Sequence, residues 1–181
     1  MINISSPFTL DDAKKLHAGD NVSISGDIYT GRDAAHKKMT ELLSEGKKLP
    51  FDVKDQIIYY VGPCPCPPDK IIGSCGPTTS CRMDAYSPIL LKEGLRGMIG
   101  KGYRSEEVIN AMKEYGGVYF CATGGLGALI SRSVVKKELV AFPELGTEAI
   151  FKLTVKDFPA VVAIDSWGNN LYNIGITKYR R

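Results

Sequence analysis

One short segment, Gly76-Pro-Thr-Thr-Ser-Cys-Arg-Met-Asp84, gathers the residue types that could hold a small acid. Gly76 and Pro77 favour a turn, and the hydroxyl of Thr78 suits the cap of a helix that begins at once. In such a helix Arg82 would lie one turn after Thr78, so the guanidinium and the hydroxyl would face the same side, beside free NH groups. That arrangement would suit a carboxylate. Taken alone, the local pattern favours an ordinary capped helix with a solvated arginine, so other segments must decide.

A second junction places a cation and an imidazole at another predicted helix start. The apolar residues of Val22–Tyr29 alternate with polar ones and predict a half-buried strand, and Gly31 permits a tight turn into a helix that runs to about Glu45. Arg32 and His36 lie one turn apart on this helix, near an end that attracts anions. Both side chains could instead be solvated, and for His36 alone the pattern favours that interpretation.

A third cation, Lys101, stands between two glycines after the short predicted strand Met98-Ile99. A lysine in a glycine turn is usually solvated, but here its ammonium has room to reach a ligand. Arg32, Arg82 and Lys101 thus all stand at the ends of elements, where α/β domains build binding sites, and three cations suit a dianion. The sequence contains no acidic pair, Ser-His-Asp arrangement, phosphate loop or metal-binding histidine pair. We therefore expect at most half of a catalytic site.

Five cysteines leave at least one thiol unpaired, which favours a reducing compartment over a secreted disulfide framework. Cys64, Cys66, Cys75 and Cys81 crowd one region, so a zinc or iron-sulfur site is the alternative. The Cys-Pro-Cys-Pro-Pro spacing argues against it, because paired thiolate ligands usually need a two-residue gap, and Cys121 lies far off in an apolar segment.

Composition predicts one globular domain over residues 1–181. Hydrophobic residues make up 44% of the chain and charged residues 24%, and the net charge of +3 is too small and dispersed to favour nucleic acid. No apolar run approaches the roughly 20 residues of a membrane span, and the first residues lack the pattern of a signal peptide. We therefore expect a cytoplasmic protein without a membrane segment.

The remaining patterns predict an α/β layered domain with a mixed sheet. The segment Gly62–Gly76 is too rich in proline and glycine for regular structure. Thr123–Gly127 opens a helix predicted to reach about Val134, but it is not a dinucleotide fingerprint. Further strands are predicted at Gln56–Val61, Gly117–Ala122, Lys137–Phe142, Ala160–Asp165 and Leu171–Ile174, and further helices at Thr9–Leu16, Asp84–Glu93, Ser105–Tyr115 and Glu148–Phe151.

Five short motifs, in this order along the chain, resemble those of a known family. They are Thr30-Gly-Arg-Asp-Ala-Ala-His-Lys37, Tyr59-Tyr-Val-Gly-Pro63, Gly76-Pro-Thr-Thr79 with Arg82-Met-Asp84, Met98-Ile-Gly-Lys101 and Gly146-Thr-Glu-Ala-Ile150. Over most of its length the chain resembles the β subunit, or C-terminal region, of class I iron-sulfur fumarate hydratases and the related L-tartrate dehydratases. The resemblance implies a swivelling β/β/α three-layer fold with a mixed sheet. It also implies the fumarate–malate interconversion of the tricarboxylic acid cycle.

The resemblance also implies roles for single residues. Arg32, Arg82 and Lys101 would clamp the substrate carboxylates, Thr78 would be the catalytic base, assisted by an aspartate of a partner, and His36 would orient neighbouring groups. A separate α subunit would hold a [4Fe-4S] cluster through three cysteines, and the two subunits would form an α2β2 heterotetramer. No metal ligand is expected on this chain, because Cys64 and Cys66 depart from the family pattern.

Two alternatives stay open at this point. One is an L-tartrate dehydratase β subunit, since every small dicarboxylate needs the same cationic clamp. The other is a non-catalytic anion-binding or regulatory module with a zinc-bound cysteine loop.

Overall fold

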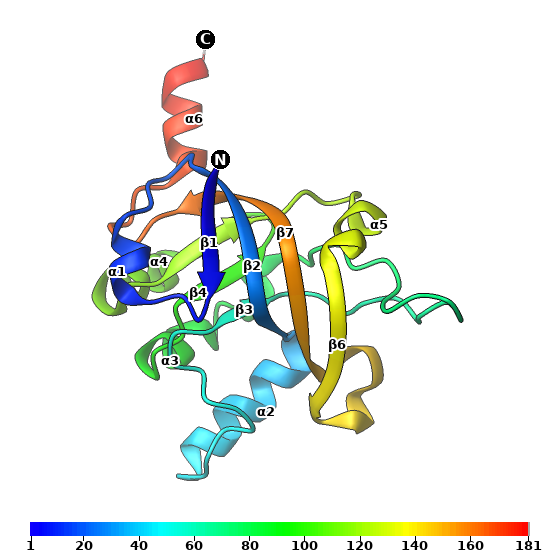
Figure 1. Ribbon diagram of the computed structural model, residues 1–181. Helices are drawn as coiled ribbons and strands as arrows, with labels where there is room; N and C mark the ends of the chain where they lie inside the picture. Colours follow the sequence, from blue (N-terminus) through cyan, green and yellow to red (C-terminus); the bar gives the residue numbers. More distant parts are fainter. Residues whose placement is uncertain (181) are drawn as a thin grey trace.

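The computed structural model describes residues 1–180, whose helices surround one mixed sheet of seven strands (Figure 1). The strands are β1 (Ile2–Ser6), β2 (Asn21–Thr30), β3 (Ile57–Tyr59), β4 (Gly97–Gly100), β5 (Val118–Cys121), β6 (Val134–Ala141) and β7 (Ile150–Ile164). The mixed sheet and the α/β class are confirmed. The predicted strand Val22–Tyr29 is confirmed as β2, and β1 is a strand that the sequence patterns did not single out.

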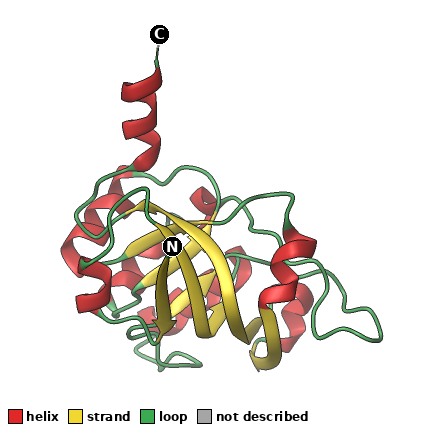
Figure 2. Ribbon diagram, turned by 45° about the horizontal axis from the view of Figure 1, so that its top comes forward, coloured by secondary structure: helices red, strands yellow, loops and turns green. Residues whose placement is uncertain are grey.

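The sheet closes on itself. Its strand order is β1-β2-β3-β4-β5-β7-β6, and β2 also pairs with β7, so five strands complete a barrel-like ring (Figure 2). Strands β1 to β5 pair in parallel, whereas β7 runs antiparallel to β2, β5 and β6. The expected β/β/α three-layer arrangement stays a prediction, because the structure describes this ring closure and does not separate the layers.

Gly26 is required where β2 bends. The register between β2 and β7 shifts between Ile24 and Gly26, and Gly26 has a φ of +106°, which other residues rarely adopt. A Cβ at this position would lie 2.6 Å from the carbonyl oxygen of Ser6 on the neighbouring strand. The glycine that interrupts the sequence alternation is therefore the residue that allows the bulge.

The period-two alternation of the central strands divides the core in two. Ile57, Tyr59 and Phe120 lie in a cluster that β2 and β7 also line, inside the closed sheet. Ile58, Tyr60 and Tyr119 point to the opposite face and pack with residues of α2, α3 and α4. Consecutive residues of β3 thus belong to different cores. Helices α2, α3 and α4 cover the outer core, whereas α1 and α5 contribute Ala13 and Ile130 to the inner one.

The helices are α1 (Leu10–Lys14), α2 (Asp33–Ser44), α3 (Ser87–Lys92), α4 (Glu106–Tyr115), α5 (Gly127–Ile130) and α6 (Leu171–Tyr179), with 3-10 turns at Ser80–Met83, Ser131–Ser133 and Pro143–Glu148. The helices predicted at Thr9–Leu16 and Ser105–Tyr115 are confirmed as α1 and α4. Thr9 and Ser105 cap them, since each side chain accepts a hydrogen bond from a backbone NH of the first turn. The segment 62–76 has no helix or strand, as predicted, and extends away from the domain (teal to green in Figure 1). None of the helices described in residues 1–180 combines the length and apolar character needed to cross a membrane.

Three predicted elements near the C-terminus are wrong. Leu171–Ile174 is not a strand but the first part of α6, because Asn170 caps a helix by accepting a hydrogen bond from the NH of Tyr172 at 3.0 Å. No helix runs over Glu148–Phe151, because a 3-10 turn ends at Glu148 and β7 begins at Ile150 and pairs with β6. The helix that opens near Gly127 ends at Ile130, since β6 already begins at Val134.

Candidate functional site

The segment that carries Thr78 is paired with a neighbouring strand end and is not the start of an α-helix. The NH of Thr78 donates to the carbonyl of Tyr60 at 2.7 Å, and the Thr78 carbonyl accepts from the NH of Lys101 at 3.3 Å. A 3-10 turn begins only at Ser80, and Thr79 precedes it without a side-chain capping bond. The predicted helix cap at Thr78 is therefore wrong, because pairing across the sheet edge uses this backbone.

The same pairing brings two of the predicted site residues together. Tyr60 follows the last residue of β3 and Lys101 the last residue of β4, and these strands are parallel neighbours. Thr79 forms an isolated bridge with Lys101, and the NH of Ser80 donates to the Lys101 carbonyl at 2.9 Å. Thr78 and Lys101 thus share the carboxyl edge of the parallel strands, where α/β proteins place their binding sites.

Arg82 projects from the 3-10 turn toward the first residue of α2. Its Nε lies 2.9 Å from Oδ1 of Asp33 and its Nη2 2.6 Å from Oδ2, so one side of the guanidinium is held by both carboxylate oxygens. The side chains of Arg82 and Asp33 remain 46% and 31% exposed, so this pair adds little stability. Its consequence is geometric, because the outer edge of the guanidinium, Nη1 with Nη2, is left for another carboxylate.

Arg32 lies at the start of α2, against the segment that follows β3. Its Nη2 is 3.4 Å from Oε1 of Glu148, and a Cβ at Gly62 would come within 2.7 Å of its Nη1. Its buried Nε has no hydrogen-bond partner among residues 1–180. Only glycine at position 62 leaves room for this side chain, which gives a physical reason for that glycine.

His36 is buried and does not reach solvent. Its Nδ1 lies 2.9 Å from the carbonyl of Arg32, which fixes the proton on Nδ1 of a neutral ring, and its ring packs edge-on against Tyr60. Burial lowers the pKa of His36 to about 4, against an ordinary value of 6.5. The interpretation of His36 as a solvated residue is wrong. The ring is placed to hold the first turn of α2, which carries Arg32.

The Lys101 side chain runs along the glycine-rich segment after β5. A Cβ at Gly124 would lie 3.3 Å from its Cδ and 3.5 Å from its Nζ. The two glycines on either side of Lys101 are required for different reasons. Gly102 has a φ of +83°, and Gly100 packs against Ser80. Glycine at 124 therefore leaves space for the lysine to extend past β5.

Sequence patterns missed the carboxylates that hold the two arginines. Asp33 lies directly after Arg32, and Glu148 belongs to the motif Gly146–Ile150. Both carboxylates therefore lie in segments that the sequence analysis had already singled out. The sequence does not say that Glu148 comes to the start of α2. There its Oε2 also accepts from the NH of Ala34 at 3.4 Å.

The cysteines do not assemble into a metal site. Cys64, Cys66 and Cys81 are exposed, whereas Cys75 is buried in the inner core, and burial raises its thiol pKa to about 11. Residues 1–180 contain no group of three or more His, Cys, Asp or Glu side chains that could hold a metal ion. The donor set of this chain therefore does not fit a zinc ion or an iron-sulfur cluster.

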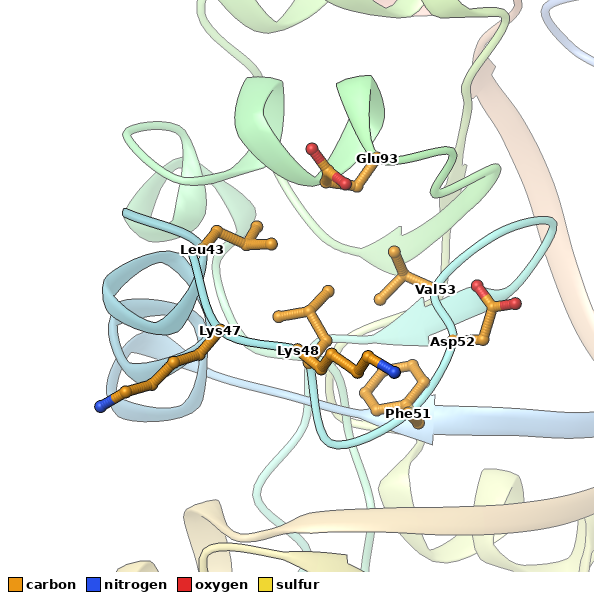
Figure 3. Close-up of a pocket in the computed structure, with 8 residues that line it drawn as sticks. Leu43, Lys47, Lys48, Phe51, Asp52, Val53 and Glu93 are labelled. Atoms are coloured by element: carbon orange, nitrogen blue, oxygen red, sulfur yellow. The ribbon is translucent and has the colours of Figure 1, made fainter. Parts of the chain in front are cut away.

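A hollow of about 580 Å³ lies elsewhere, between the end of α2 and the loop that leads into β3 (Figure 3). Leu43, Lys47, Phe51, Val53 and Glu93 are among its lining residues, and the Lys47 ammonium points away from it in Figure 3. None of the predicted site residues lines this hollow. Of the cationic residues, Arg82 is nearly half exposed, whereas the side chain of Arg32 is 22% exposed.

Comparisons with known proteins match this chain over almost its whole length. Residues 1–175 match the family described as the fumarase C-terminus. The chain is 43% identical over 159 residues to the anaerobic class I fumarate hydratase of Escherichia coli strain K12, which covers 87% of this chain and 29% of that protein. It is 40% identical over 157 residues to fumarate hydratase 2 of Leishmania major. The matched region is 86% of this chain and 28% of that protein.

A third relative has a similar length to this chain. The putative L(+)-tartrate dehydratase subunit beta of Methanocaldococcus jannaschii is 42% identical over 170 residues, which are 91% of this chain and 87% of that subunit. The chain therefore spans less than a third of the fumarate hydratases but most of the tartrate dehydratase subunit.

Proposed function

The chain belongs to the fumarase C-terminus family, and from this premise we propose that it is the β part of a hydro-lyase that interconverts fumarate and malate. One observation carries the proposal. The carboxyl edge of β3 and β4 places the backbone of Thr78 against Lys101, while Arg82 is tied to Asp33, the neighbour of Arg32. Cations and a hydroxyl at one open edge suit a dicarboxylate.

Hydration adds a hydroxyl to one olefinic carbon and a proton to the next, and dehydration removes both as water. In our proposal Arg32, Arg82 and Lys101 hold the substrate carboxylates, and Thr78 exchanges the proton on carbon. A threonine hydroxyl is a weak base, so a carboxylate of the partner must assist it. The neutral His36 donates its one ring proton, on Nδ1, to the carbonyl of Arg32, so its role is to hold the turn that carries Arg32.

The rest of the catalytic site must come from elsewhere. The Escherichia coli and Leishmania major fumarate hydratases compared above are more than three times as long as the matched region, whereas the tartrate dehydratase relative is a subunit. We therefore propose a separate α subunit that carries the [4Fe-4S] cluster and forms an α2β2 complex with this chain in the cytoplasm. The cysteines of this chain do not fit a cluster, so the ligands of the cluster would all belong to the α subunit.

L-tartrate is the second candidate substrate, because the β subunit named for tartrate dehydratase matches this chain over 87% of its own length. Tartrate and malate carry the same pair of carboxylates, so the residues that hold the carboxylates do not separate them.

The test is turnover in a reconstituted complex. The chain would be combined under anaerobic conditions with a cluster-bearing α subunit, and fumarate, L-malate and L-tartrate would each be supplied. We expect turnover only when both subunits are present. Turnover by this chain alone would refute the proposal that the catalytic site needs residues of both subunits. Dicarboxylate binding by a fully loaded complex without any turnover would favour the anion-binding module.

A further inference from the structure

Arg104 is a buried charge that the proposed reaction does not use. Its side chain is fully buried, and its Nε lies 2.7 Å from Oδ1 of Asp84, whose side chain is 13% exposed. Its Nη2 donates to Oγ of Ser87 at 2.7 Å. A buried guanidinium is costly unless its charge and its hydrogen-bond donors are matched, so an ion pair of this kind constrains its surroundings strongly.

The two members of this pair lie on the two segments that carry site residues. Asp84 directly follows the 3-10 turn that holds Arg82, and Arg104 lies three positions after Lys101. The second oxygen of Asp84 accepts from the NH of Ser105 at 2.7 Å. Both carboxylate oxygens of Asp84 are therefore committed to Arg104 and Ser105.

Two aromatic rings extend the same link to the backbone of the site. The guanidinium of Arg104 lies 5.4 Å from the ring centre of Tyr60 and 5.1 Å from that of Tyr119. The Tyr60 carbonyl holds the NH of Thr78. The hydroxyl of Tyr119 donates either to Oγ of Ser80, at 2.9 Å, or to the carbonyl of Gly102, at 3.0 Å. Arg104 therefore packs between the groups that fix both segments.

We infer that Arg104 and Asp84 are positioning residues for the dicarboxylate site, an inference that rests on the proposed function. Neither touches the substrate. Their ion pair fixes the separation between the segment 78–84, which carries Thr78 and Arg82, and Lys101.

The test uses Arg104→Lys, which keeps the charge but removes the planar fork, and Asp84→Asn, which keeps the shape but removes the charge. Amide hydrogen exchange of the full chain should rise about tenfold or more in peptides that cover 78–84 and 100–105, and stay unchanged over α2. In the complex with the α subunit, KM for fumarate should rise about tenfold and kcat should fall, since misplaced clamp residues weaken both binding and alignment. A smaller folded fraction would lower the apparent kcat without raising KM.

Arg96→Lys is the matched control, because Arg96 is also a buried arginine paired with an aspartate, Asp55. It should leave KM and the exchange of the 78–84 peptide unchanged. If Asp84→Asn folds and shows wild-type exchange and wild-type KM, the inference is refuted, even if Arg104→Lys fails to fold. If the wild-type complex turns over no dicarboxylate, the proposed function fails, and the exchange data still decide whether the pair holds the two segments.

Discussion

The two ends of β4 carry the same kind of buried ion pair and use it differently. Before the strand, Arg96 binds Asp55 at 3.2 Å and donates to the carbonyls of Tyr115 and Gly116, at the end of α4. This arrangement satisfies carbonyls that a helix end leaves unpaired. After the strand, Arg104 binds Asp84.

The partners of Arg104 are side chains and aromatic rings. The backbone carbonyl of Tyr60 accepts from the NH of Thr78, and the hydroxyl of Tyr119 contacts Ser80, whose NH donates to the Lys101 carbonyl. At the amino end of β4 the arginine completes the fold. At the carboxyl end we propose that a similar pair positions the dicarboxylate site. Residue type and burial are thus poor guides to function, whereas the identity of the partners and of the strand end is informative.

The largest expected effect is on the free energy of unfolding at low pH. It should distinguish His36, near the site, from the exposed His17. His36 is neutral in the folded chain because burial lowers its pKa to about 4, whereas the unfolded chain takes up a proton below about 6.5. This group should therefore destabilise the fold progressively as the pH falls from 6.5 to 4, by up to about 3 kcal/mol, and have no effect above that range.

Urea unfolding of wild type and His36→Asn at pH 7 and pH 4.5 would measure this difference. The variant should lose less stability than the wild type over the same range. His17→Gln, at an exposed position, is the control and should follow the wild type. Equal losses in wild type and His36→Asn would show that His36 accepts a proton without unfolding.

Removal of the Thr78 hydroxyl should abolish most of the activity without disturbing the amino end of β4. In the reconstituted complex, Thr78→Ala should lower kcat about a hundredfold, or about 2.7 kcal/mol, with KM nearly unchanged, and Thr78→Ser should lie between. Thr79→Ala is the control, because Thr79 is exposed and forms no capping bond. A larger effect of Thr79→Ala would assign the base to the wrong threonine.

The glycines at the two ends of β4 separate folding from site geometry. A Cβ at Gly97 would lie 2.7 Å from Cγ1 of Ile57, and one at Gly100 would lie 1.9 Å from Oγ of Ser80. Both Gly→Ala variants should lose about 1 to 3 kcal/mol by overpacking. Only Gly100→Ala should also raise KM, because Ser80 is bonded to the Lys101 carbonyl. Equal KM values in both variants, measured on folded protein, would show that Ser80 does not help to position Lys101.

Local signals predicted the elements better than their meeting points. The alternation of Val22–Tyr29 and the caps at Thr9 and Ser105 act over a few residues, and the structure has them. Thr78 matches a helix cap equally well by type, but its backbone pairs with Tyr60 and Lys101, which lie far from it in the sequence. Only the pairing of β3 with β4, which brings Tyr60 and Lys101 to the same edge, decides between these alternatives.

The same reason explains what was missed at the site. Arg32, Arg82 and Lys101 are visible as cations at the ends of elements, but Glu148 and Arg104 gain their meaning only through contacts with distant segments. For α6 the error was of another kind, since Asn170 is equally suited to a turn and to a helix cap.

The smallest effect is expected at Arg82, where a lysine keeps the charge. Nε and Nη2 of Arg82 are bound to Asp33, and the remaining edge of the guanidinium is proposed to hold a substrate carboxylate through two parallel hydrogen bonds. Lysine supplies a point charge and cannot bind Asp33 and the substrate with the same planar geometry. Arg82→Lys should therefore raise KM about tenfold, or about 1.4 kcal/mol, and change stability little because the pair is exposed.

Arg132→Lys provides the control, since Arg132 is an exposed arginine outside the proposed clamp. It should leave KM at the wild-type value. Asp33→Asn refines the result, because it removes the group that orients Arg82 but leaves the guanidinium in place. If orientation by Asp33 is important, Asp33→Asn should raise KM above the wild-type value, but by less than Arg82→Lys does. If charge alone binds the substrate, Arg82→Lys should bind fumarate as the wild type does, and the fork would have no part in recognition.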